Sequence, residues 1–398
     1  MKRIYIITFI TAILSVVAIV GINTALFSKD MDKTIKVGFM YVGDASTAYT
    51  NNFMKAQKAI EEAYGNQVIA VAKYNVSEGL EDKYFQELID EKCDIIFATS
   101  FGYADAAKRF AQMYPDVEIV MATGTNANDE PKLNNYHTFM GEIYQGRYTA
   151  GVAAGMKIKE LIDSGIIDES QAKVGYVGAY PYAEVISGYT AFILGVRSVV
   201  PQAHMIVKYT NSWSNYALEK RYAKELIDEE CVIISQHSDT AGPAVACEQT
   251  DASTPVYLVS YNQSMADIAP TTYLTGSKIN WSYYMIGAVG AVLEGRNIEN
   301  TVDGRAYGND MMAGFEKNWI EMLDINEVVA APGTKQRVES VCDEFRKGQV
   351  HVFFGDYTGV SVNDKNDTCN LNDEYIENYR SSAPTFNYIL NKIITIEE

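Results

Sequence analysis

The sequence has few of the residues from which metal and redox centres are built. Its 398 residues include five cysteines and four histidines, and no two cysteines form a CxxC pair. A zinc or dithiol motif is therefore not indicated, and no HExxH or DxDxG pattern suggests a metal site. We expect no metal and no cofactor. Cys93 and Cys231 read as small apolar residues that open buried strands, whereas Cys342 and Cys369 would be able to pair in an oxidising compartment.

Basic residues are also scarce. The 33 Lys and Arg residues are outnumbered by 51 Asp and Glu residues, which gives a formal net charge of −18. This charge argues against nucleic acid or anionic lipid as the main partner, because both bind to basic surfaces. The phosphate-binding patterns GxxxxGK[ST] and GxGxxG are missing as well.

The run His237-Ser238-Asp239 invites interpretation as part of a hydrolase. A catalytic triad, however, needs residues that are adjacent in space and a nucleophile that is activated. The sequence also lacks the GxSxG elbow found in many hydrolases. We therefore predict that the chain is not an enzyme, and we keep a hydrolase as an alternative.

One long uncharged segment stands at the N-terminus. Lys2 and Arg3 precede residues 4–27, which carry no charged side chain and are long enough to span a bilayer. The best cleavage position, near Ala25, is poor because Asn23 precedes it, and no cysteine available for lipid attachment follows. We predict an uncleaved anchor in residues 1–32, with a cleaved signal as the alternative, and place the rest of the chain outside the cytoplasm.

One stretch of sequence occurs twice. Residues 81–96 (EDKYFQELIDEKCDII) recur 138 positions later, counted from 81 to 219, as EKRYAKELIDEECVII. Each copy predicts an amphipathic helix followed by a short apolar strand, so we expect two similar α/β lobes. Polar segments follow the two strands, at residues 100–103 and 236–239. Because open parallel sheets bind ligands beyond the carboxyl ends of their strands, these segments should face each other across a cleft.

The remaining elements predict a doubly wound parallel sheet in each lobe. Residues 123–135 are polar and rich in turn formers, so we assign the first crossover to them and the second to residues 275–281. The first lobe should then comprise residues 33–125 and 268–296, and the second lobe residues 126–267 and 297–398. The small residues of the helix at 144–158 should pack closely on a sheet, and the chain after residue 296 reads as poor in strands.

The predicted strand ends carry aromatic rings and hydrogen-bonding side chains. This combination is typical of a pocket for a flat, polar small molecule. A nucleobase would fit, because its ring stacks and an Asp or Asn reads its edge through two hydrogen bonds. The residues concerned are Asp44, Tyr49, Ser100, Phe101, Tyr180, Trp213, His237, Asp239, Tyr261 and Asn262.

Several segments are distinctive as a set. They are KVGFMYVG at 36–43, YQGRYTAGVAAG at 144–155, VGYVGAYP at 174–181, TNSW at 210–213 and QHSD at 236–239. In this order they resemble the basic-membrane-protein family, the substrate-binding proteins of ABC importers related to the purine-nucleoside receptor type. The resemblance departs from the family pattern in three respects: residues 44–52 lack its Gly-rich pattern and bulky aromatic, Ser264 replaces a common Asp, and the lipid-anchoring Cys is missing.

The resemblance implies a type I periplasmic-binding fold, with two Rossmann-like lobes, three crossovers and a ligand enclosed by hinge closure near Thr125 and Ile268. It implies a monomeric receptor that binds a nucleoside or related molecule, passes it to ABC permease subunits and catalyses nothing. A ligand sensor for a membrane partner and a nucleoside hydrolase remain as alternatives. The predicted ligand-binding residues are Asp44, Tyr49, Asn52, Ser100, Phe101, Gly102, Tyr180, Trp213, Gln236, His237, Asp239, Tyr261, Asn262, Ser264 and Lys278. Among them, Tyr49, Phe101 and Trp213 would sandwich the base.

Overall fold

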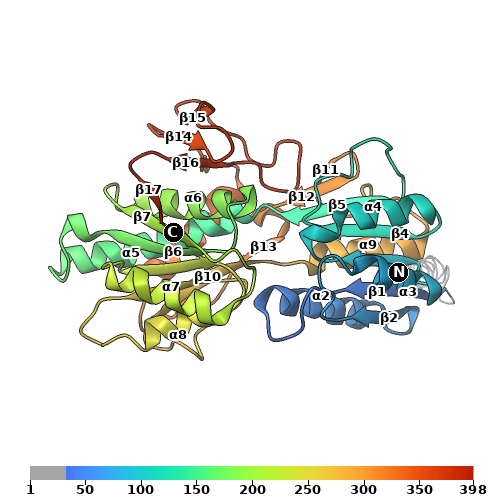
Figure 1. Cartoon of the computed structure of the whole chain (residues 1–398), viewed down its shortest axis with the longest axis horizontal. Helices are drawn as coiled ribbons and strands as arrows, with labels where there is room; N and C mark the ends of the chain where they lie inside the picture. Colours follow the sequence, from blue (N-terminus) through green and yellow to red (C-terminus); the bar gives the residue numbers. More distant parts are fainter. Residues whose placement is uncertain (1–32, 398) are drawn as a thin grey trace, which may run out of the picture.

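The computed structural model describes residues 33–397, so the anchor expected in residues 1–32 lies outside the described part. The described residues form two α/β lobes that lie side by side, each built around a seven-stranded, mostly parallel sheet (Figure 1). This confirms the predicted fold class. No helix among residues 33–397 combines the length and apolar character that a bilayer crossing requires.

The first lobe has the strand order β11-β12-β5-β4-β3-β1-β2, and only the β11–β12 pair is antiparallel. Its strands are β1 (Ile35–Met40), β2 (Val68–Lys73), β3 (Ile95–Ala98), β4 (Glu118–Ala122), β5 (Tyr136–Gly141), β11 (Arg305–Tyr307) and β12 (Asp310–Ala313). Its helices are α2 (Ala48–Tyr64), α3 (Glu81–Asp90), α4 (Ala104–Met113) and α9 (Ser282–Glu294).

The second lobe repeats this plan with the order β13-β10-β9-β8-β6-β7-β17, in which only β10–β13 is antiparallel. Its strands are β6 (Lys173–Gly178), β7 (His204–Tyr209), β8 (Ile233–His237), β9 (Tyr257–Tyr261), β10 (Tyr273–Ile279), β13 (Ile320–Met322) and β17 (Ile394–Glu397). Its helices are α5 (Ile143–Asp163), α6 (Ala183–Arg197), α7 (Tyr216–Asp228), α8 (Gly242–Glu248) and α10 (Thr334–Arg346).

The duplicated stretch forms the same packing unit in both lobes, as α3–β3 and α7–β8. In each lobe a glycine of the strand that pairs with the unit's strand, β1 or β6, leaves room for the unit's cysteine. A Cβ on Gly38 would lie 3.2 Å from Cys93 Sγ, and one on Gly175 would lie 3.2 Å from Cys231 Cβ. Each copy also holds a lysine of the preceding strand between two glutamates: Lys73 by Glu87 and Glu91, and Lys208 by Glu225 and Glu229.

Within residues 33–397 the chain passes between the lobes three times, as expected for this fold, but only the predicted crossover at residues 275–281 includes an observed crossing, at its end. It crosses at Glu142, at residues 280–281 and at residues 314–319. Residues 123–135 instead join β4 to β5 within the first sheet, and residues 275–278 lie inside β10 of the second sheet. Thr125 and Ile268, expected near the hinge, therefore lie in loops within single lobes.

The crossing segments are joined to one another by hydrogen bonds. The Glu142 N–H donates to Ala313 O, and the Phe315 N–H donates to Gln145 Oε1 at 2.9 Å. The Asn280 N–H donates to Trp319 O, so the second and third crossings are also connected. Burial raises the pKa of Glu142 to about 7, with the neighbouring guanidinium of Arg305 acting against the rise.

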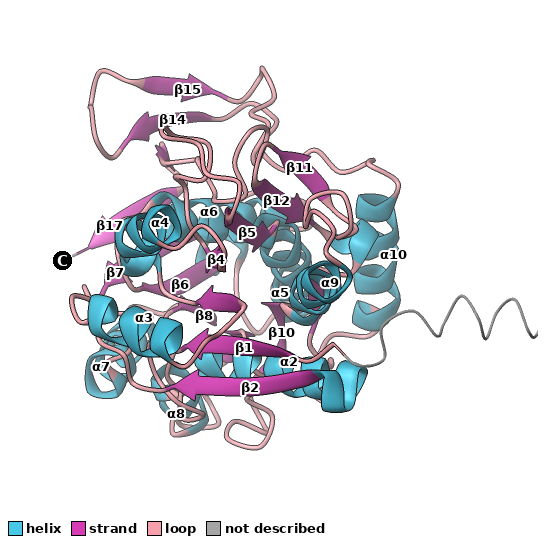
Figure 2. Ribbon diagram, turned by 90° about the vertical axis from the view of Figure 1, so that its right-hand side faces the viewer, coloured by secondary structure: helices cyan, strands magenta, loops and turns pink. Residues whose placement is uncertain are grey.

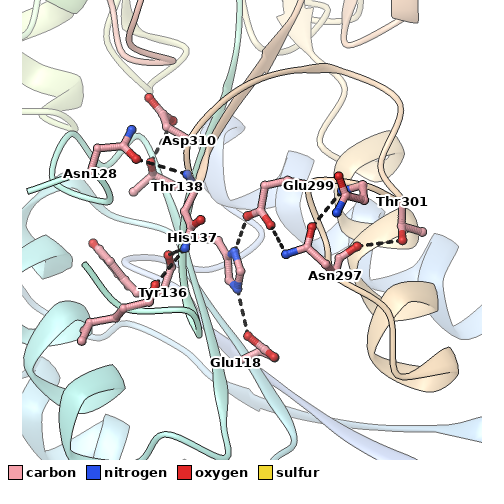
Figure 3. Close-up of polar contacts among 12 residues, drawn as sticks. Glu118, Asn128, Tyr136, His137, Thr138, Asn297, Glu299, Thr301 and Asp310 are labelled. Carbon is pink, nitrogen blue, oxygen red and sulfur yellow. Dashed lines mark hydrogen bonds and ion pairs between the residues drawn. The ribbon is translucent and has the colours of Figure 1, made fainter. Parts of the chain in front are cut away.

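The unpredicted strand β5 is fully buried although it contains polar residues. His137 lies between two carboxylates, with Nδ1 2.5 Å from Glu299 Oε1 and Nε2 2.8 Å from Glu118 Oε2 (Figure 3). The Thr138 hydroxyl donates to Asp310 of β12 at 2.8 Å. These partners come from distant segments, which explains how polar side chains are accommodated in a buried strand.

The small residues of α5 contact both a sheet and a helix. Gly146 faces Ser277 of β10, as the expected helix–sheet packing requires. Gly151, however, lies against α6, where an added Cβ would be 2.0 Å from Phe192 O, and Gly155 also approaches the α6 backbone. The glycines therefore also permit a close helix–helix contact.

The C-terminal region is richer in strands than the sequence suggested. After residue 296 the chain adds β11, β12, β13 and β17 to the two main sheets. It also forms a small antiparallel sheet of β14 (Thr358–Ser361), β15 (Thr368–Asn370) and β16 (Tyr388–Leu390). This small sheet lies above the second lobe in Figure 1, and β14 and β15 project beyond both lobes in Figure 2. All five cysteines are free, so Cys342 and Cys369 are not paired.

Candidate functional site

A cavity lies between the lobes at the carboxyl ends of their strands. It encloses about 500 Å³ of non-atom space, of which about 60 Å³ is open to the centre of a water-sized sphere. We call it the inner cavity. Its lining comes from both lobes: Val42, Tyr49, Ser100, Phe101 and Thr123 from the first, and Glu184, Trp213, His237, Ser238, Asp239 and Tyr261 from the second.

Parallel strands place these residues at one edge of each sheet. Ser100 and Thr123 follow β3 and β4, while His237 and Tyr261 are the last residues of β8 and β9. The two duplicated units thus end at the same cavity, as their segments at 100–103 and 236–239 suggested. The lobes also touch beside it, where Asn52 Nδ2 donates to Asn262 O at 2.9 Å.

Aromatic rings form much of the wall. Trp213 lies 5.2 Å from Tyr180 and 6.1 Å from Tyr182, measured between ring centroids. Phe101 of the first lobe approaches Tyr182 of the second at 6.1 Å. On the opposite side, Tyr49 packs edge-on against Phe53. Such surfaces favour a ligand with a flat ring.

Two carboxyl groups, those of Glu184 and Asp239, line the inner cavity. No donor among the described residues bonds the carboxylate of Asp239, although its N–H donates to Trp213 O at 2.9 Å. Burial raises the pKa of Asp239 well above its usual range, and the nearby carboxylates Glu219 and Glu184 add to the rise. The raised pKa favours the neutral acid in the free protein, whereas a ligand with two donors would favour the carboxylate, which can accept two hydrogen bonds.

His237 is buried, and its surroundings favour the neutral imidazole. Burial lowers the pKa of His237, although Glu184, whose Oε1 lies 3.4 Å from Nε2, acts in the opposite direction. The positive charge of Arg147 lowers the pKa of His237 further. The other ring nitrogen, Nδ1, has no partner among the described residues and lies against Gly188, where a Cβ would be 2.7 Å away.

Ser238 and Gln236 stabilise the loop rather than form a triad. The Ser238 hydroxyl donates to Glu219 Oε2 at 2.8 Å, away from His237. Gln236 Nε2 donates to the carbonyls of Ser238 and Thr240, both at 2.9 Å. These bonds hold the loop in place, and the Ser238 hydroxyl is not directed to His237 as a catalytic triad would require.

Eight predicted ligand-binding residues do not line the inner cavity. The Asp44 carboxylate accepts a hydrogen bond from the Ser46 N–H within a turn, and the Gly102 N–H donates to Glu78. Lys278 forms an ion pair with Glu321 at 2.8 Å. Ser264 is exposed. Asn52, Gln236 and Asn262 are buried near the lining, and the half-buried Tyr180 packs against Trp213.

Four lining residues were not predicted: Val42, Thr123, Glu184 and Ser238. Glu184 is the most informative of them, because it is the second carboxylate of the cavity. It stands in the first turn of α6, just beyond the strand-end segment that supplied Tyr180. A search of the residues that follow each predicted strand would have included Glu184 if it had continued through the first turn of the next helix.

Comparisons with known proteins agree with this architecture. The Bmp family, described as ABC transporter substrate-binding protein PnrA-like, matches residues 34–344. A Brucella abortus protein named as purine-binding is 32% identical over 266 residues, which cover 66% of this chain and 70% of the relative. A Haloferax volcanii protein, provisionally named for glucose binding by an ABC transporter, is 27% identical over 81% of this chain and 75% of its own length.

A solved structure shows the same fold. The solute-binding protein of an ABC transporter system from Conexibacter woesei superposes with a TM-score of 0.62 at 16% identity, covering 80% of this chain and 98% of that one. The family match, the identity to the Brucella protein and the shared fold agree. The chain belongs to the Bmp family of ABC transporter substrate-binding proteins, which act outside the cytoplasm.

Proposed function

We propose that this protein is the receptor of an ABC importer for a purine nucleoside or a closely related compound, which it binds and releases unchanged. The observation that carries the proposal is the Asp239 carboxyl group, which has no donor among residues 33–397 and lines a cavity with aromatic walls from both lobes. The name of the Brucella relative supports a purine as part of the ligand.

The chemistry of the cavity suits such a molecule. Tyr49, Phe101 and Trp213 offer ring faces against which a base can stack. Asp239 can accept two hydrogen bonds, either from the N–H groups of a base edge or from neighbouring hydroxyls of a sugar. Among the residues that the structure describes, no Lys or Arg lines the inner cavity, so the site favours a neutral ligand over a phosphorylated one.

The same geometry argues against catalysis. A hydrolase with a Ser-His-Asp triad would need a serine hydrogen-bonded to the histidine, but Ser238 donates to Glu219, and His237 contacts Glu184. A receptor needs only to bind and release its ligand, and the arrangement at the cavity is sufficient for that.

Calorimetric titration of the full chain with guanosine, adenosine, inosine and glucose tests the proposal. We expect at least one nucleoside to bind, and Asp239→Asn to weaken binding by about tenfold or more, because a hydrogen bond to a charged group is lost. Trp213→Ala should weaken it to a similar extent through lost stacking. Asp251→Asn, in an exposed turn with Ser253, is the matched control and should leave affinity unchanged. Binding of glucose alone, or unchanged affinity in the Asp239 variant, would contradict the proposal.

We also propose that residues 1–32 hold the receptor at the membrane. The full chain should then sediment with membranes, and a chain that starts at residue 33 should not. Equal distribution of the two chains would contradict this.

A further inference from the structure

A second cavity, here called the outer chamber, adjoins the inner cavity. About 370 Å³ of it is open to the centre of a water-sized sphere, compared with about 60 Å³ in the inner cavity. The two spaces share Phe101, Thr123, Glu184 and Trp213 in their walls. A molecule stacked on Trp213 in one space would therefore have a route into the other.

The outer wall of this chamber comes from the C-terminal region. It includes Val362, Asn363, Pro384 and Asn387, all of which follow the last residue of the family match, 344. We call residues 345–397 the C-terminal extension. Its chamber-lining residues stand more than 140 positions after Trp213 in the sequence, so only the folded chain brings them to the site.

Buried hydrogen bonds hold the extension in place on both lobes. In the second lobe, Ser187 of α6 donates to Glu377 Oε2 at 2.7 Å, and the Thr385 N–H donates to Glu377 Oε1 at 2.7 Å. In the first lobe, Asp310 Oδ2 accepts from the Ser382 N–H at 2.7 Å. The last strand, β17, pairs with β7. The chamber wall is thus a fixed part of the structure and not a loose tail.

The chamber is lined by neutral hydrogen-bonding groups and aromatic rings. Asn363 and Thr125 offer exposed amide and hydroxyl groups, and Tyr182 and Trp213 offer ring faces. Of the described residues that line it, Glu184 is the one with an acidic side chain, and none is a Lys or an Arg. Amides, a carboxylate and ring faces can bind the hydroxyls and apolar face of a sugar, whereas a phosphate would meet only negative charge.

We propose that the outer chamber is a second subsite, which binds the neutral, sugar-like half of the ligand while the inner cavity holds its ring. This rests on the proposed function for the identity of the ring. The C-terminal extension thereby becomes part of the binding site, and it selects a nucleoside over both the free base and the nucleotide.

Calorimetry of the full chain with adenine, adenosine and adenosine 5′-monophosphate tests the subsite. The wild type should bind adenosine about tenfold more tightly than adenine, and the monophosphate about tenfold more weakly than adenosine. Val362→Trp, at a side chain that is 40% exposed, should fill the chamber and reduce adenosine affinity to that of adenine, without changing adenine binding. Asn363→Ala, a smaller change, should weaken adenosine alone by about threefold.

Val328→Trp is the matched control, because Val328 is 95% exposed and lines neither cavity. It should bind all three compounds as the wild type does. If the wild type binds none of these compounds and neither guanosine nor inosine, the proposed function fails, and the ligand assigned to the subsite fails with it. If purines bind but Val362→Trp weakens adenine and adenosine equally, or weakens neither, the second subsite alone is refuted.

Discussion

His137 should make the stability of the first lobe depend on pH. Its side chain is buried in β5 between the carboxylates of Glu299 and Glu118 (Figure 3). Burial lowers the pKa of His137, but the hydrogen bonds to Glu118 and Glu299 outweigh it and raise the pKa to about 9 from the ordinary 6.5. The imidazolium is therefore the stable form in the native protein at neutral pH.

The size and direction of the effect follow from linkage. A rise in pKa from 6.5 to about 9 corresponds to about 3 kcal/mol, at about 1.4 kcal/mol for each pKa unit. Because the native pKa lies above the unfolded one, this stabilisation is fully present below pH 6.5 and is lost as the pH rises through 9. Solvent screens part of it, since the Glu118 side chain is 35% exposed.

Urea unfolding of the wild type and His137→Gln between pH 6 and pH 9.5 measures the effect. The difference in free energy of unfolding should be about 3 kcal/mol larger at pH 6 than at pH 9.5. His351→Gln is the control: His351 lies 2.8 Å from Glu374 but is 56% exposed. Its variant should differ from the wild type by less than about 1 kcal/mol at every pH. A difference for His137→Gln that does not change with pH would refute the reasoning.

Three further results are expected. Burial raises the pKa of Glu142 to about 7, so ionisation of its carboxyl group destabilises the native protein increasingly from pH 4.5 to 7. In urea unfolding, Glu142→Gln should therefore gain stability relative to the wild type over that range. A relative loss would contradict this. Gly151→Ala should lower stability by about 1–3 kcal/mol in thermal unfolding, because its Cβ would lie 2.0 Å from Phe192 O, and an unchanged Tm would show that α5 and α6 can separate freely. Burial raises the pKa of Asp239, so a ligand that donates hydrogen bonds to the Asp239 carboxylate should lower that pKa and cause Asp239 to release protons on binding. Calorimetry in buffers of different ionisation enthalpy measures this release. Proton uptake would mean that the ligand instead accepts a hydrogen bond from the protonated acid.

The fold could be predicted because its signal is local and repeated. Each copy of the duplicated stretch contains its own helix period, strand and cysteine, and both copies form the same unit around Gly38 and Gly175. The fifth strands, β5 and β10, were not predicted because their polar residues resemble loop residues. In the structure, distant partners accommodate those residues, as Glu299 does for His137 and as Leu323 O does for Thr275. No pattern within a short window contains that information.

Part of the site was predictable for a similar reason. Seven predicted residues line the inner cavity because each follows a strand or opens the next helix at the same sheet edge: Tyr49, Ser100, Phe101, Trp213, His237, Asp239 and Tyr261. Asp44 and Lys278 also stand near strand ends, but hydrogen bonds or ion pairs with neighbours occupy their side chains. The position of a residue along a strand predicts the sheet edge at which it lies. It does not predict whether the side chain already has a partner within the protein or is available to bind a ligand.

The C-terminal extension also affects how the lobes can move. Ser382 is bonded to Asp310 of the first lobe, whereas β16 and β17 follow shortly after it in the chain and β17 belongs to the sheet of the second lobe. The residues between these two attachments include Pro384 and Asn387, which line the outer chamber. Any opening of the lobes must therefore break the bond to Asp310 or displace the chamber wall. Because the same short segment forms the wall and joins the lobes, access to the inner cavity and the shape of the outer chamber cannot change independently.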